Sequence, residues 1–249
     1  MRVSVSMSSE VQPGTAPGGG LGAPFAVLFA PDRGMDRQAK VGRARWFFLF
    51  AWLCSILLAA VMALRVDARS STLRNLETSG QLQSMSDRQI ADETRSAERV
   101  FQVTSIAKGA TSVPVQLGLA CVSILVLCWF FRGRVKGRAV VPVAATTLLP
   151  GAIANLVDAV AAYRHAVLPP EPVPLGPRSL SAVLVLAGRP LMDPWVKFGN
   201  ALDFFSLWAA LMMGFGVAAV GQIRRRTAVT GTLIAWVCLR LLTNVATKG

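Results

Sequence analysis

The sequence has few of the side chains that build metal centres and catalytic sites. Its only histidine is His165, and its four cysteines lie inside apolar runs with no CxxC pair among them. One histidine cannot supply a histidine-rich metal site, and no phosphate-binding loop, GxSxG or HExxH motif is present. Cysteines in apolar runs are typical of small buried residues. We therefore expect no metal, no cofactor and no enzyme activity.

Charged residues are also scarce, and their distribution is uneven. They make up 16% of the 249 residues, whereas 53% are hydrophobic; a soluble domain carries about 25% charged residues. The net charge of +13 would suit nucleic-acid binding if it covered one face of a soluble domain. Here the positive charges cluster beside apolar runs, which is typical of membrane orientation. We therefore expect a membrane partner and no nucleic acid.

Five apolar runs are long enough to cross a bilayer as helices, which takes about 20 residues. The predicted spans are residues 46–64, 115–131, 139–163, 204–222 and 228–246. The third span contains Leu149-Pro150-Gly151, where a proline removes a backbone donor and predicts a break. The first span follows a 45-residue polar region, which predicts an uncleaved membrane anchor and not a signal peptide. The predicted fold class is all-α: a polytopic bundle of five transmembrane helices with an extracytoplasmic helical loop.

The two long connections carry weaker signals. In residues 65–113, Ser86 stands three positions before Gln89, which is a capping box. It predicts a helix over residues 87–105, outside the bilayer. In the connection 164–203, residues 180–187 are apolar but too short to span. They predict a short interfacial or re-entrant helix capped by Ser179.

The N-terminal region divides into two parts. Residues 1–24 are rich in Ser, Pro and Gly and read as a disordered tail. Residues 25–45 are a basic juxtamembrane segment, in which helical spacing puts three cations on one face. Such a segment predicts either a surface helix on anionic lipid or a solvated tether. Its basic residues are Arg33, Arg37, Lys40, Arg43 and Arg45.

Orientation follows from the charges of the connections. With the N-terminus in the cytoplasm, the cytoplasmic segments 1–45, 132–138 and 223–227 hold 13 basic and 3 acidic residues. The two outside connections hold 11 basic and 9 acidic residues over a greater length. Basic residues in short cytoplasmic loops set orientation. We therefore expect a multi-pass cell-membrane protein with its N-terminus in the cytoplasm and its C-terminus outside.

Ionisable residues within or beside the spans are the candidate site. Asp158 lies near the outer end of the third span, with Asn155 one turn below it, and Arg240 lies inside the fifth span. Asp203 stands at the outer rim of the fourth. Intramembrane charges mark either polar sites and proton paths or ion pairs between helices, and both alternatives remain open. In either case we expect Arg240 to pair with Asp203 or Asp158.

Small residues recur every four positions along the fourth span, at Ala210, Gly214 and Ala218. Small residues let helices approach closely in lipid. The pattern favours packing within the bundle over a dimer interface.

One stretch carries a family resemblance. Residues 200–216, NALDFFSLWAALMMGFG, resemble the Yip family, the Ypt/Rab-interacting five-pass membrane proteins, and most closely its bacterial branch. The matching positions are Asp203, Phe204, Ser206, Leu207, Trp208, Gly214 and Gly216; the SMSDRQIADE region and the Leu149-Pro150 break also look like the family. The resemblance implies five spans with the same orientation. The 21 arginines against 5 lysines suggest a bacterial genome of high GC content.

Two functions fit these observations. The first is a non-enzymatic membrane-organising or adaptor protein, whose basic segment contacts anionic lipid or a cytoplasmic or membrane protein partner. The alternative is a small-solute or ion transporter with a polar site around Asp158, Asn155 and Arg240. A water-filled cavity that reaches Asp158 would distinguish the two.

Overall fold

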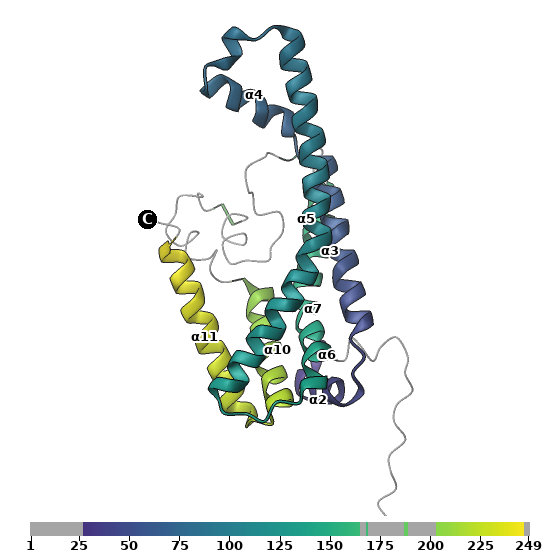
Figure 1. The fold of residues 1–249 in the computed structure, drawn as a ribbon, viewed down its shortest axis with the longest axis vertical. Coiled ribbons are helices and arrows are strands. Elements are labelled where there is room, and N and C mark those ends of the chain that lie inside the picture. The colour runs from purple at the N-terminus through teal and green to yellow at the C-terminus, as the bar shows by residue number, and fades with distance from the viewer. Residues whose placement is uncertain (1–26, 165–167, 169–186, 189–202, 247–249) are drawn as a thin grey trace, which may run out of the picture.

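The computed structural model describes residues 27–164, 168, 187–188 and 203–246. Every regular element in these ranges is a helix, apart from an isolated bridge between Val66 and Leu168. The all-α fold class is therefore confirmed for this part of the chain (Figure 1). The predicted tail, residues 1–24, and residues 180–186 of the predicted short helix lie outside the described residues.

Four helical segments are long and apolar enough to cross a membrane: Arg45–Arg65, Asp87–Phe130, Gly137–Arg164 and Phe204–Gly221. They are α3, α5, the consecutive pair α6 (Gly137–Thr147) and α7 (Leu149–Arg164), and α10. They coincide with the first four predicted spans. The fifth predicted run forms α11 (Arg225–Ala246), a helix of 22 residues that is not among the four. The fifth crossing therefore stays a prediction.

Helix α5 corrects the prediction for residues 87–131. The capping box is confirmed: the Ser86 N–H donates to Gln89 Oε1 at 2.8 Å, and the Gln89 N–H donates to Ser86 Oγ at 3.4 Å. The helix does not end near residue 105. It continues for 44 residues to Phe130, about 66 Å at 1.5 Å per residue. This is about twice the hydrocarbon thickness of a bilayer, so its first half projects beyond the apolar bundle (Figure 1).

Helix α5 runs through Pro114 because α3 supplies the missing hydrogen bond. Proline has no N–H, so the carbonyl of Ala110, one turn earlier, loses its usual intrahelical donor. The indole N–H of Trp52 in α3 donates to that carbonyl at 2.8 Å. One turn further along α3, Ser55 Oγ donates to the carbonyl of Gly109 at 2.9 Å. These two bonds tie α3 to α5 at the level of the proline.

Close approach of α3 and α5 requires glycine at position 109. A Cβ atom there would lie 2.4 Å from the Cβ atom of Ala59, which is shorter than any van der Waals contact. The contact between backbones brings Ser55 within reach of the Gly109 carbonyl. Small residues therefore let the two helices come close enough to form these hydrogen bonds.

The predicted break in the third span is confirmed. Helix α6 ends at Thr147, α7 begins at Leu149, and Leu148 between them is in a turn. Pro150 lacks the N–H that would bond the carbonyl of Thr146, which weakens the helix at this point. The Leu148 N–H bonds instead to the carbonyl of Ala145 at 3.3 Å. Both halves belong to one candidate span, Gly137–Arg164, so the break does not change the number of predicted spans.

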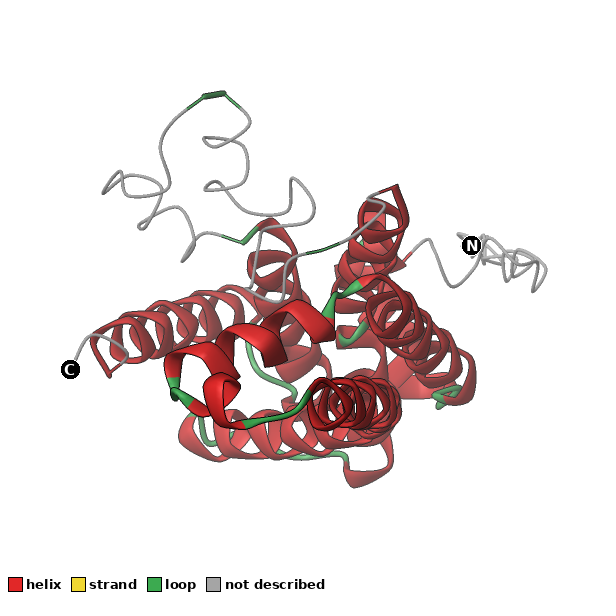
Figure 2. Cartoon of the chain, turned by 90° about the horizontal axis from the view of Figure 1, so that it is seen from above, coloured by secondary structure: helices red, strands yellow, loops and turns green. Residues whose placement is uncertain are grey.

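Helix α10 lies at the centre of the bundle and meets a different neighbour at each of three glycines. A Cβ atom at Gly214 would lie 2.7 Å from Val229 Cα in α11. One at Gly216 would lie 2.6 Å from a methyl group of Val143 in α6, and one at Gly221 would lie 2.8 Å from the sulfur of Cys128 in α5. Of the small residues predicted to pack within the bundle, Gly214 approaches α11, and Ala210 and Ala218 are buried. Helix α11 packs against α10 and extends to one side of the bundle (Figure 2).

Two further helices lie at opposite ends of the bundle. Helix α4 (Ala68–Thr78) packs against the projecting half of α5, and the side chain of Asp67 caps it by accepting from the Ser70 N–H at 3.1 Å. Sequence patterns did not predict α4. Helix α2 (Pro31–Val41) packs against α6 and α10 at the other end.

We expect Trp52→Phe to lower the free energy of unfolding by about 1–3 kcal/mol, since it leaves the carbonyl of Ala110 without its donor. In a Pro114→Ala background the helix regains its own N–H, so the same change should cost less. Unfolding by sodium dodecyl sulfate in mixed micelles measures both. Trp46→Phe, at a tryptophan with 73% of its surface exposed on the same helix, is the control. An equal cost in both backgrounds would contradict this account.

Candidate functional site

Two of the predicted polar residues share one helix of the bundle. Asp158 lies on α7 with 5% of its surface exposed, and Asn155, three residues earlier on the same helix, is half-buried. Burial of a carboxylate inside an apolar helix is costly unless the surroundings stabilise it. The structure thus places Asp158 where either a structural or a functional interaction is expected.

Asp203 has a role that the sequence reasoning missed. It is the N-cap of α10: its Oδ1 accepts from the Phe205 N–H at 3.0 Å, and its carbonyl accepts from Ser206 Oγ at 3.1 Å. An aspartate directly before an apolar run is a typical helix start, so the signal was present in the sequence. The cap fixes the start of the central helix.

Arg240 lies over an aromatic ring of its own helix. Its guanidinium carbon is 5.7 Å from the centroid of the Trp236 ring, within the range of a cation–π interaction. The side chain therefore points back toward the start of α11, as side chains on helices do. Its predicted pairing with Asp203 or Asp158 stays a prediction.

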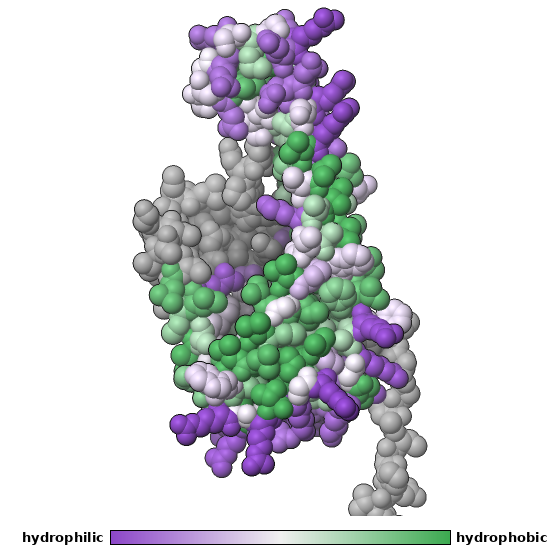
Figure 3. Space-filling view, viewed as in Figure 1, coloured by the Kyte–Doolittle hydropathy of each residue, from purple (hydrophilic) through white to green (hydrophobic). Residues whose placement is uncertain are grey.

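Positive charge gathers at one end of the bundle. The hydrophilic surface there is separated by a broad apolar belt from the hydrophilic surface around α4 (Figure 3). All the Arg and Lys side chains at this cationic end are exposed. They are Arg33, Arg37, Lys40, Arg43, Arg45, Arg132, Arg134, Lys136, Arg138, Arg224, Arg225 and Arg226. Three stretches far apart in the sequence thus form one basic surface.

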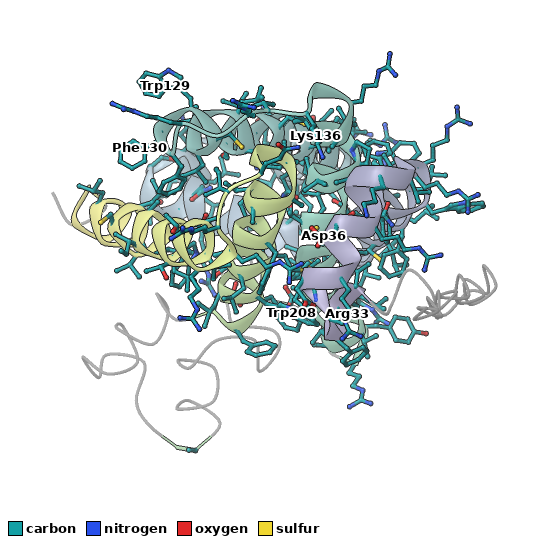
Figure 4. The ribbon with its side chains drawn as sticks, turned by 90° about the horizontal axis from the view of Figure 1, so that it is seen from below. Arg33, Asp36, Trp129, Phe130, Lys136 and Trp208 are labelled. Carbon is teal, nitrogen blue, oxygen red and sulfur yellow. The ribbon has the colours of Figure 1, made fainter. Side chains whose placement is uncertain are left out.

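Arg225 joins the N-terminal segment to the start of α11. Its guanidinium pairs with Asp32 at 3.4 Å and with Asp36 at 2.5 Å, one turn apart on α2. On the protein side of α2, Met35 is fully buried. Arg33 lies on α2 away from the bundle centre, in the view from below (Figure 4). The acidic groups of α2 are therefore used within the protein, while its cations remain exposed.

This arrangement adds to the prediction for residues 25–45, whose contact with lipid stays a prediction. The two alternatives were a surface helix on lipid and a solvated tether, and neither included docking on the bundle. The helix itself is confirmed over Pro31–Val41. Gly34 allows the preceding turn to fold back on it, since a Cβ there would lie 2.8 Å from Val27 Cα.

The connection after α5 holds the C-terminal end of α10. The N–H groups of Arg134 and Lys136 donate to the carbonyls of Gly221 and Val220 at 2.9 and 3.0 Å. These are carbonyls that a helix leaves without intrahelical partners at its C-terminus. Beside this connection, Trp129 and Phe130 are 80% and 70% exposed and point outward (Figure 4). Exposed aromatics next to cations are typical of a membrane interface.

The cysteines agree only in part with the expectation that all are buried. Cys54 and Cys128 are buried and Cys121 is half-buried, but Cys238 is exposed on α11. All four are free thiols. Among the residues that the structure describes, no three His, Cys, Asp or Glu side chains lie close enough to hold a metal ion.

Comparisons with protein-family models, with curated proteins and with solved structures find nothing that matches this chain. The resemblance to the Yip family therefore rests on the sequence stretches quoted above.

We expect Asp203→Ala to lower the free energy of unfolding by about 0.5–2 kcal/mol through loss of the cap. Asp203→Asn keeps a capping side chain and removes the charge. If the carboxylate only caps α10, the Asn variant should unfold like the wild type; if it also pairs with Arg240, the Asn variant should lose stability. Unfolding in mixed micelles, with Arg240→Leu as the second change in a double-mutant cycle, separates the two roles.

We expect Arg225→Gln to weaken the docking of α2. Exposed ion pairs contribute about 0–1 kcal/mol each, and both side chains here are partly exposed, so the effect should be modest. Hydrogen exchange of the α2 amides should become faster, whereas Arg224→Gln, at the adjacent exposed arginine, should leave it unchanged. Equal exchange in wild type and Arg225→Gln would show that the apolar contacts of Met35 alone hold the helix.

Proposed function

We propose that this chain is a five-span membrane protein of the Yip type that organises the membrane without enzymatic activity, by gathering anionic lipids around its cationic end. The observation that carries the proposal is the convergence of three basic stretches on one exposed surface beside the apolar belt. A surface of this kind attracts anionic headgroups.

Two features support the membrane orientation within this proposal. The cationic end contains the N-terminal segment and both short connections, and short basic connections face the cytoplasm. The projecting half of α5 and α4 carry residues of both signs, such as Arg88, Asp92 and Glu93, which suits an outer aqueous side. Helix α11, about 33 Å long at 1.5 Å per residue, supplies the fifth crossing.

The docking of α2 supports a role in lipid contact. The two aspartates of α2 are engaged by Arg225, so they offer little repulsion to an anionic headgroup. Arg33, Arg37 and Lys40 stay exposed on the same helix. Each cation near an anionic surface contributes about 1 kcal/mol of attraction. The helix can therefore present its charges at a fixed place rather than on a loose tether.

Replacing Arg33, Arg37 and Lys40 together by glutamine should lower the preference of the reconstituted protein for anionic over zwitterionic lipid. Spin-labelled phosphatidylglycerol and phosphatidylcholine, compared by their motionally restricted fractions, measure this preference. It should also fall as salt rises, since exposed charges are screened over about 8 Å at physiological ionic strength.

The matched control replaces Arg88, Arg95 and Arg99, three exposed arginines of the projecting half of α5. It removes the same charge from the other end and should leave the preference unchanged. Equal loss in both variants, or no preference in the wild type, would reject lipid gathering at the cationic end.

The second candidate, a small-solute or ion transporter, is favoured by the burial of Asp158 within α7. Transport predicts that Asp158→Asn abolishes solute flux in vesicles while the protein still folds. A structural role predicts a change in folding yield and no flux in the wild type.

A further inference from the structure

A groove of about 560 Å³ runs along the side of the bundle between α5, α10 and α11, at the level of the α6–α7 break. Helices α5 and α11 meet at their lower ends and diverge upward with α10 between them (Figure 1). The lower end is closed by Phe131, whose ring leaves no room for a side chain at Gly231 of α11.

Small residues on the facing helices create this hollow. Ala120 and Ala210 are buried at its floor, and Gly151 lines it at the break, where an added Cβ would meet nothing within 4 Å. Its surface is almost entirely apolar. The hydroxyl of Thr147 donates to the carbonyl of Ala144 at 2.8 Å, and the hydroxyl of Thr232 is buried without a hydrogen-bond partner among the described residues. The groove therefore suits a hydrocarbon and offers water little.

The groove opens toward the surface that faces lipid. Its rim includes Leu119 and Leu239, which are 62% and 61% exposed, and the neighbouring Val122 is 57% exposed. These side chains belong to the apolar belt, so the hollow is continuous with the surface that meets acyl chains. An empty hollow there would lose dispersion contacts that a hydrocarbon chain restores.

The side chain of Arg240 lies beside the groove. Trp236 and Leu239 line it, and the guanidinium of the adjacent Arg240 lies over the Trp236 ring. Trp236 is eight residues along α11 from Ala228, the first fully buried residue of that helix, which is about 12 Å at 1.5 Å per residue, so the guanidinium over its ring lies within the apolar belt.

We propose that this groove binds one acyl chain of a phospholipid. The proposal requires α5, α10 and α11 to lie in a bilayer, but it does not depend on lipid gathering at the cationic end. If α2 contributes no preference for anionic lipid, lipid gathering at the cationic end is rejected. That result would not affect the proposal for the groove.

The test uses the full chain in vesicles that contain a phospholipid with a diazirine on its acyl chain. After irradiation, labelled residues are mapped by mass spectrometry. We expect Met213 and Trp236, which line the groove, to be labelled several-fold more than Leu53 and Leu57, which are exposed on α3. Labelling in proportion to exposure alone would overturn the proposal, as would links between two copies of the chain at the groove in place of lipid.

Gly151→Leu should reduce labelling of the groove several-fold, because its side chain would project into the hollow. Gly118→Leu is the matched control: Gly118 is also an exposed glycine in a span, an added Cβ there also meets nothing within 4 Å, and it does not line the groove. Ala235→Leu, at an exposed lining residue of α11, gives a second test if Gly151→Leu misfolds. Unchanged labelling in a folded lining variant would overturn the proposal.

Discussion

The fold depends on the requirement that backbone polar groups inside a bilayer find partners within the protein. In this chain the requirement is hardest to meet at prolines and at helix ends. At Pro114 the indole of Trp52 replaces the missing intrahelical donor. At the C-terminal end of α10, backbone N–H groups of the connection between α5 and α6 donate to its terminal carbonyls, with Lys136 bonding Val220 at 3.0 Å. Each solution needs a second helix at close range, so hydrogen bonding determines which helices are neighbours.

Close range in turn requires small residues. Without a hydrophobic force between helices in lipid, van der Waals contact and polar bonds hold the bundle together. Gly109 lets α3 approach α5, while Gly214 and Gly216 let α11 and α6 approach α10. The same small side chains leave the apolar groove where α5 and α11 diverge. Packing and the proposed lipid site thus have one origin in the distribution of Gly and Ala.

Sequence patterns predicted the features that depend on local composition. The apolar runs, the capping box at Ser86 and the break at Leu149-Pro150 were recognisable because each depends on residues within one or two turns. The continuity of α5 could not be predicted, since it depends on Trp52, 62 positions before Pro114 in the chain. The docking of α2 was missed for the same reason: Arg225 lies far from Asp32 and Asp36 in sequence. The groove is formed by four separate helical segments, and no local pattern indicates it.

The central claim is that the cationic end faces the cytoplasm and that α11 completes a fifth crossing. Single cysteines at Val135 and Lys248, in a background without Cys54, Cys121, Cys128 and Cys238, test it with a membrane-impermeant thiol reagent applied to intact cells. The account predicts labelling at position 248 from outside, and labelling at position 135 only after the membrane is opened. Labelling of both positions only in opened cells would place both termini of α11 inside and contradict the five-span arrangement.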